Sequence, residues 1–137
     1  MRSEYKIWKD KVWKRFSIFI RTRDADENGM VNCVTCGIWK HWKEGDAGHF
    51  LAGRYNSNLF DERGCHFQCK PCNAGDRLFY QNRKVDVKKN YRAYMLQRYG
   101  IAVIKELERN NRKTKQFTVK ELKESCEKYE SMLRLNQ

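Results

Sequence analysis

The sequence lacks long apolar runs, has one proline, and contains no tract of low complexity. A membrane-spanning helix needs about 18 uninterrupted apolar residues, and no stretch approaches that length. Charges begin at Arg2, which is also unlike a secretory signal. We therefore expect no membrane association and a reducing, cytoplasmic setting.

Acidic residues are in the minority, with 17 Asp and Glu against 29 Lys and Arg, for a net charge of +12. The excess is uneven: residues 1–32 carry +3, residues 33–69 are neutral, residues 70–100 carry +6, and residues 101–137 carry +3. A basic stretch beside a neutral centre favours a polyanion partner, most simply nucleic acid. The alternative is an ordinary solvated surface that keeps the protein soluble.

Six cysteines in a reducing compartment are expected to be metal ligands before disulfides. Two pairs have the Cys-x-x-Cys spacing, in which a tight turn lets both thiolates face one ion. They predict a structural Zn²⁺ site held by Cys33, Cys36, Cys69 and Cys72. The other two cysteines, Cys65 and Cys126, are expected to pack as small apolar side chains, although Cys65 could also be a substitute ligand.

Helical periodicity appears at both ends of the chain. Residues 4–22 carry an apolar helical face, and Thr118 with Glu121 forms a capping box before a second apolar stripe, Val119 to Leu133. The stripe is expected to pack onto the domain, with a dimer contact as the alternative. Between these ends, residues 31–73 show only short strand-like pieces ("GHFLA", "NLF"). A helical pattern then runs from about Asn73 to Tyr99.

Two residues mark expected boundaries within the second half of the chain. Asp86 can start a helix, and Gly100 can interrupt the helical pattern before "IAVIKELE". We divide the chain into an N-terminal helix (1–30), a central core with its following helices (31–108), and a basic connector with a C-terminal helix (109–137).

The order of motifs resembles the HNH, or ββα-metal, nucleases. It is most similar to the NinG (Rap) recombination endonucleases of lambdoid phages, through "FSIFIRTRDAD", "CVTCG", "DAGHF", "HFQCKPCN" and "YRAYMLQRYG". The cysteine-rich segment is also similar to that of phage endonuclease VII. The resemblance implies an α+β fold, with a ββα-metal core stapled by the four-cysteine zinc site and flanked by N- and C-terminal helices.

The resemblance also implies a site for phosphodiester hydrolysis. His49 would activate water, with its other ring nitrogen held by a backbone carbonyl. Asn73, in the first turn of the helix after the second cysteine pair, would bind a catalytic Mg²⁺ or Mn²⁺. Asp46 or His66 would complete this metal site, and the sequence does not choose between them.

Two positions depart from the family pattern. Gly48 stands where many HNH enzymes have a metal-binding aspartate, and Gly64 stands where NinG-like proteins tend to have an asparagine that orients the hairpin. These departures support a rival interpretation, a non-catalytic zinc-ribbon DNA-binding protein with a decayed nuclease site.

The expected partner is DNA, branched or partly single-stranded, such as Holliday junctions or D-loops, in the host-cell cytoplasm of a phage. Phosphate contacts are expected from the basic side chains after the second cysteine pair: Arg77, Arg83, Lys84, Lys88, Lys89 and Arg92. Symmetric cleavage of a junction needs two active sites, so a homodimer is also considered.

Overall fold

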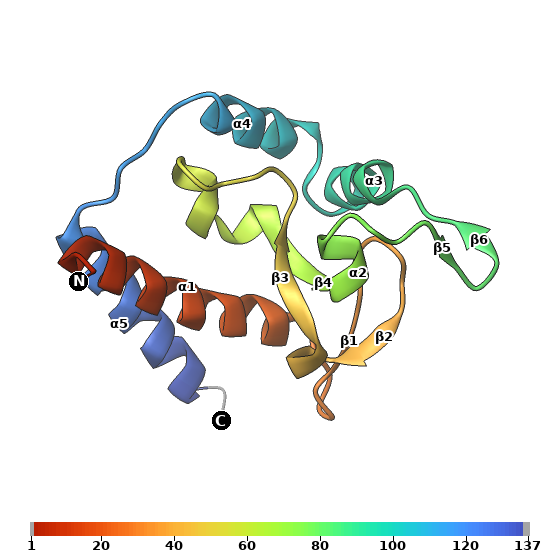
Figure 1. The fold of residues 1–137 in the computed structure, drawn as a ribbon, viewed down its shortest axis with the longest axis horizontal. Coiled ribbons are helices and arrows are strands. Elements are labelled where there is room, and N and C mark those ends of the chain that lie inside the picture. The colour runs from red at the N-terminus through yellow and green to blue at the C-terminus, as the bar shows by residue number, and fades with distance from the viewer. Residues whose placement is uncertain (1, 136–137) are drawn as a thin grey trace.

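In the computed structural model, which describes residues 2–135, helices from the two ends of the chain pack against each other (Figure 1). Helix α1 spans Glu4–Arg23 and begins at Ser3, whose hydroxyl accepts the Lys6 N–H. Helix α5 spans Val119–Leu135 and begins with the predicted capping box, in which the Glu121 N–H donates to the Thr118 hydroxyl at 3.0 Å. Both helices were expected, and both are confirmed.

The apolar stripe of α5 is covered by α1. Val12 of α1 packs with Leu122 and Cys126, and farther along Phe16 packs with Tyr129. Cys65 belongs to the second of these clusters, so Cys65 and Cys126 both pack as expected. The stripe is therefore used within the chain, which confirms the expected packing onto the domain.

Three antiparallel strand pairs lie between the two end helices. β1 (Met30–Asn32) pairs with β2 (Trp39–His41), β3 (Gly45–His49) with β4 (Cys65–Cys69), and β5 (Phe79–Tyr80) with β6 (Arg83–Lys84). The one-turn helix α2 (Lys70–Asn73) follows β4 directly. The fold is thus mixed α+β, and β3, β4 and α2 follow in the order strand, strand, helix.

Three local expectations differ from the structure. The piece "NLF" lies in a 3₁₀ helix, Ser57–Phe60, because the Asn56 side chain accepts the Asn58 N–H and turns the chain. The strand in "GHFLA" ends at His49. The helical pattern from Asn73 is interrupted, because Gly75 has φ +78° and the β5–β6 hairpin follows.

Helices α3 and α4 meet at the boundary that their flanking residues predict. Helix α3 (Val87–Tyr99) begins at Asp86, whose carboxylate accepts the Lys89 N–H. Gly100 separates α3 from α4 (Ile101–Asn111). Its φ angle of +88° is a backbone conformation that favours glycine. No helix between residues 2 and 135 is both long and apolar enough to span a membrane.

Candidate active site and metal centre

The two Cys-x-x-Cys turns bring their four sulfurs together. The Sγ atoms of Cys33, Cys36, Cys69 and Cys72 all lie within 4.8 Å of one another, and those of Cys36 and Cys69 are 3.7 Å apart. Tetrahedral zinc with bonds of about 2.3 Å separates its sulfurs by about 3.8 Å. The cluster can therefore hold a zinc ion, as the spacing predicts.

Nearby polar groups support the sulfurs of this cluster. Burial raises the pKa of Cys33, but the Thr35 hydroxyl and three backbone N–H groups outweigh burial and lower that pKa to about 7. Burial and the neighbouring Cys33 thiolate raise the pKa of Cys36 to about 11. Four close thiols thus resist sharing negative charge, a cost that a bound cation offsets.

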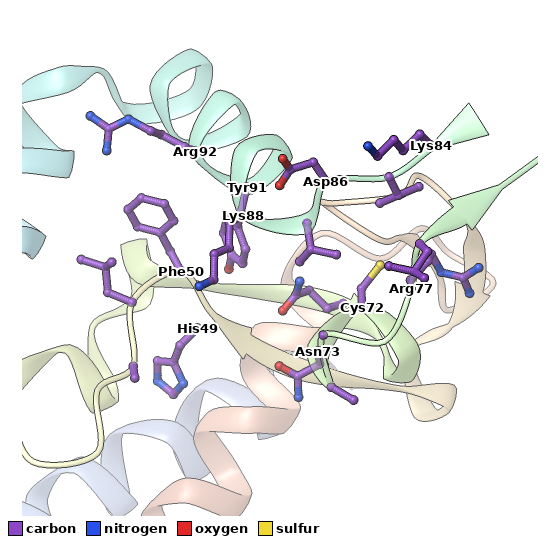
Figure 2. Close-up of a pocket in the computed structure, with 18 residues that line it drawn as sticks. His49, Phe50, Cys72, Asn73, Arg77, Lys84, Asp86, Lys88, Tyr91 and Arg92 are labelled. Atoms are coloured by element: carbon purple, nitrogen blue, oxygen red, sulfur yellow. The ribbon is translucent and has the colours of Figure 1, made fainter.

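Beside this cluster lies a pocket of about 830 Å³ (Figure 2). It is bordered by the end of β3, by α2, by the segment after α2, and by the start of α3. The structure brings His49 and Asn73 together in its lining, with four of the six predicted basic residues: Arg77, Lys84, Lys88 and Arg92. In Figure 2 the Lys88 side chain reaches from α3 toward His49.

His49 is held by the body of the protein on one side. Its ring stacks on Trp13 of α1, with centroids 5.4 Å apart and planes at 20°, and its Nε2 lies 3.0 Å from the Leu59 carbonyl oxygen. Because a carbonyl only accepts, Nε2 carries the proton. Burial lowers the pKa of His49, although the bond to Leu59 acts to raise it. The ring is therefore neutral near pH 7 with an unprotonated Nδ1.

Asn73 is oriented by Asp46, one of the two residues expected to complete the metal site. The Asn73 side-chain NH₂ donates to one Asp46 carboxylate oxygen at 3.2 Å, and Lys70 donates to the other at 3.0 Å. A carboxylate only accepts, so the NH₂ group faces Asp46 and the Asn73 Oδ1 faces away. Asp46 thus contacts the residue expected to bind metal, and both of its oxygens already accept hydrogen bonds.

Gln68 is a site residue that sequence reasoning missed. This buried side chain donates from Nε2 to the Thr35 hydroxyl at 3.1 Å, and that hydroxyl lies 3.3 Å from the Cys33 sulfur. Because the Gln68 Nε2 is used in this chain of hydrogen bonds, the Gln68 Oε1 remains available to the pocket, which Gln68 lines. β4 pairs Gln68 with Asp46, but this register is not readable from a five-residue strand.

Two amide oxygens converge beside Gly48. A Cβ atom built on Gly48 would lie 1.9 Å from the Gln68 Oε1 and 3.0 Å from the Asn73 Oδ1. The space that an aspartate would need is therefore filled by Gln68. Both oxygens lie within 3.0 Å of the same point, and amide oxygens are ligands that Mg²⁺ and similar hard cations accept.

His66 is not brought into the pocket. The Tyr91 hydroxyl donates to the Gly48 carbonyl at 2.6 Å and accepts from His66 Nδ1 at 3.2 Å, while the Tyr99 hydroxyl lies 2.8 Å from His66 Nε2. Burial, with repulsion from Arg23 and Arg98, lowers the pKa of His66 to about 3. Neither ring nitrogen is free for a metal ion. His66 instead holds the strand that ends in His49.

The loop between β3 and β4 is ordered without an asparagine at position 64. The Phe50 N–H donates to the Gly64 carbonyl at 2.9 Å, and the buried Asn58 side chain donates to the Leu107 carbonyl at 2.9 Å. Asn58 directly precedes Leu59, whose carbonyl holds His49. Asn58 thus orders the segment that the missing asparagine would be expected to orient.

The remaining predicted DNA contacts lie around the pocket. Arg83 and Lys89 are exposed outside its lining. Arg77 is partly engaged, since its guanidinium lies beside the Cys69 sulfur, which raises the arginine pKa, and also donates to the Phe79 carbonyl. Arg92 lies 3.6 Å from Glu108. The pocket rim is basic, and the cysteine cluster anchors one of its arginines.

In comparisons with known proteins, the family model and the curated relatives that match this chain belong to the same family. The family described as "Bacteriophage Lambda NinG protein" matches residues 2–137. Protein NinG of Salmonella phage P22 is 30% identical over 128 residues, covering 93% of this chain and 56% of the relative. Protein NinG of Escherichia phage lambda is 28% identical, with the same coverage. The chain spans about half the length of these relatives, and no solved structure matches it.

Proposed function

Because this chain belongs to the NinG family of bacteriophage proteins, we propose that it is a metal-dependent DNA endonuclease of the HNH, or ββα-metal, type. One observation carries the proposal: a neutral histidine and two oriented amide oxygens share a pocket with basic side chains. We further propose branched or partly single-stranded recombination intermediates as the DNA.

His49 is the general base in this proposal. Its Nδ1 is unprotonated at neutral pH, because the Leu59 carbonyl holds the proton on Nε2 and burial disfavours the charged ring. Nδ1 makes no hydrogen bond within residues 2–135 and is not among the fully buried unpartnered atoms. It can therefore take a proton from a water molecule in the pocket.

The Asn73 and Gln68 oxygens fit a hard divalent cation such as Mg²⁺ or Mn²⁺. Bound there, the cation would stabilise the charge on the scissile phosphate and on the leaving 3′ oxygen. Asp46 positions Asn73, and Thr35 positions Gln68. Lys88 and Arg92 bind neighbouring phosphates and hold the strand in the pocket.

Zinc at the four cysteines serves shape in this proposal. Cys69 is the N-cap of α2 and Cys72 directly precedes Asn73, so a metal on these sulfurs fixes where Asn73 lies. Through Thr35 the same cluster fixes Gln68. The zinc ion would therefore orient both amides while lying outside the reaction itself.

The test is cleavage of supercoiled plasmid and of a synthetic four-way junction with Mg²⁺ or Mn²⁺. His49→Ala should lower the cleavage rate by at least about 100-fold, the usual contribution of a general base. Because burial lowers the His49 pKa, the wild-type rate should fall to half of its plateau at a pH below the ordinary histidine value of 6.5, as Nδ1 becomes protonated.

His41→Ala is the matched control, because His41 lies on β2 outside the pocket lining and should cut like wild type. Equal rates for wild type and His49→Ala would refute the assignment of the base. DNA binding without cleavage at any metal would favour the zinc-ribbon binding protein instead.

A further inference from the structure

An exposed apolar pair, Leu78 and Phe79, lies at the basic edge of the pocket and at the base of a hairpin. Leu78 and Phe79 are 66% and 62% exposed, in the segment between α2 and α3. In Figure 1 this segment, the β5–β6 hairpin, projects from one end of the molecule beyond α2 and α3. Large apolar side chains held out in this way are a typical mark of a binding site.

The β5–β6 hairpin has regular strand pairing and a defined turn. Phe79 pairs with Lys84 and Tyr80 with Arg83, and the two residues between the strands, Gln81 and Asn82, have φ values of +52° and +63°. Two consecutive positive φ values are typical of the two-residue turn that best suits a hairpin. The hairpin that carries the apolar pair is therefore held in a defined shape.

The base of the hairpin is fixed to the rest of the protein. The Val85 N–H donates to the Leu78 carbonyl at 2.7 Å, and the Val85 side chain is buried. The Arg77 guanidinium lies 5.4 Å from the Tyr80 ring centroid and also beside the Cys69 sulfur. The hairpin is thus positioned by the cysteine cluster that positions Asn73.

The charge around the apolar pair indicates which kind of partner it binds. Between Asp76 and Asp86 the segment carries Arg77, Arg83 and Lys84 and no acidic residue. A second copy of a chain with net charge +12 would bring like charges together at this edge. Nucleic acid offers the complement, since phosphates pair with the basic side chains and base faces accept apolar and aromatic ones.

We propose that the β5–β6 hairpin binds unpaired bases of the DNA strand that enters the pocket. Leu78 and Lys84 line the pocket itself, so a strand held there continues onto the hairpin. The faces of paired bases are stacked inside the duplex, so the apolar pair distinguishes DNA with unpaired bases from uniform duplex. The inference rests on the proposed function, because it places the DNA in the same pocket.

The test is DNA binding without catalysis. Zinc-loaded protein with no added divalent ion is titrated into a fluorescent duplex and into the same duplex with a central unpaired bubble, and anisotropy is recorded. The double variant Leu78→Ser/Phe79→Ser should bind the bubble about tenfold more weakly and change less than about twofold on duplex.

Two further variants separate base contact from other effects. Leu135→Ser removes an apolar side chain that is 84% exposed at the end of α5, and it should bind both DNAs like wild type. Phe79→Trp keeps an aromatic face and should keep the bubble preference. Zinc content and circular dichroism equal to wild type confirm that each variant is folded.

Equal weakening of the double variant on both DNAs, or no weakening, would overturn the inference. Sedimentation could also overturn the inference. If the wild type formed a dimer without DNA and the double variant did not, the apolar pair would be a contact between two copies of the chain. If the protein preferred the bubble through the apolar pair but cleaved no DNA, the result would support base binding by the hairpin and refute the proposed nuclease activity. Failure of the wild type to bind any DNA would refute both.

Discussion

Gly48 shows how one missing side chain shapes the pocket. A methyl group there would lie 1.9 Å from the Gln68 Oε1, so Gly48→Ala must push the Gln68 amide out of place. We predict that Gly48→Ala weakens Mn²⁺ binding at least about tenfold, measured by Mn²⁺ electron paramagnetic resonance, and lowers unfolding stability by about 1–3 kcal/mol, the usual cost of overpacking.

Gly64→Ala is the control for this change. A Cβ atom at Gly64 would meet only Leu107, at 3.6 Å, an ordinary contact distance. Its Mn²⁺ affinity should equal that of wild type, and its stability should change by less than about 0.5 kcal/mol. Similar Mn²⁺ affinities for the two alanine variants would show that Gly48 has no special role at the metal.

The motif order was enough to bring His49 and Asn73 forward as site residues, because both are adjacent to recognisable sequence landmarks. Gln68 was not predictable, because its role depends on the Thr35 hydroxyl and on the strand register that pairs it with Asp46. The position of His66 was equally hidden, since Tyr91 and Tyr99 come from a helix more than twenty residues later.

Among the elements, the two cysteine turns join segments that are far apart in the sequence. They connect the β1–β2 turn to β4 and α2, and besides the cysteines their apolar cluster contains Ile38 and Val87, both partly buried. We predict one zinc ion per chain. Cys69→Ser should lose the zinc and show a lower, broader thermal transition by circular dichroism, because binding contributes directly to folding.

Cys126→Ser tests whether any buried thiol would do the same. Cys126 is buried like Cys33, Cys69 and Cys72 but lies in the α1–α5 contact, far along the chain from the turns. It should keep one zinc per chain and lose only packing energy. Normal folding of wild type with less than one zinc per chain would contradict the prediction.

The helices with strong capping residues were predictable, since Asp86, Gly100 and Thr118 act through local hydrogen bonds and backbone angles. The β5–β6 hairpin was not. Its strands have two residues each, and its apolar residues also fit the spacing of a helix. Its turn uses Gln-Asn in place of a glycine-containing pair, which removes the usual signal.

At the scale of the whole molecule, the charge excess should appear as salt-dependent DNA binding. Each phosphate contact contributes about 0.9 to the slope of log affinity against log salt concentration. Lys88→Ala and Arg92→Ala, which remove basic side chains from the pocket, should each reduce that slope by about this amount, measured by anisotropy over a salt series.

Lys120→Ala removes an exposed positive charge from α5, away from the pocket, and should leave the slope unchanged. If all three variants reduced the slope equally, the binding surface would be the general charge of the protein. The pocket would then have no special part in holding DNA.

The pairing of α1 with α5 also bears on the order in which parts of the fold form as the chain is synthesised. Helix α1 is made before α5, so Val12 lacks Leu122 and Cys126, and Phe16 lacks Tyr129, until residues 119–135 have been synthesised. Until then, the helix whose Trp13 supports His49 has an uncovered apolar face. In the nascent chain, the helix that supports His49 therefore gains its full packing only after both cysteine turns have been synthesised.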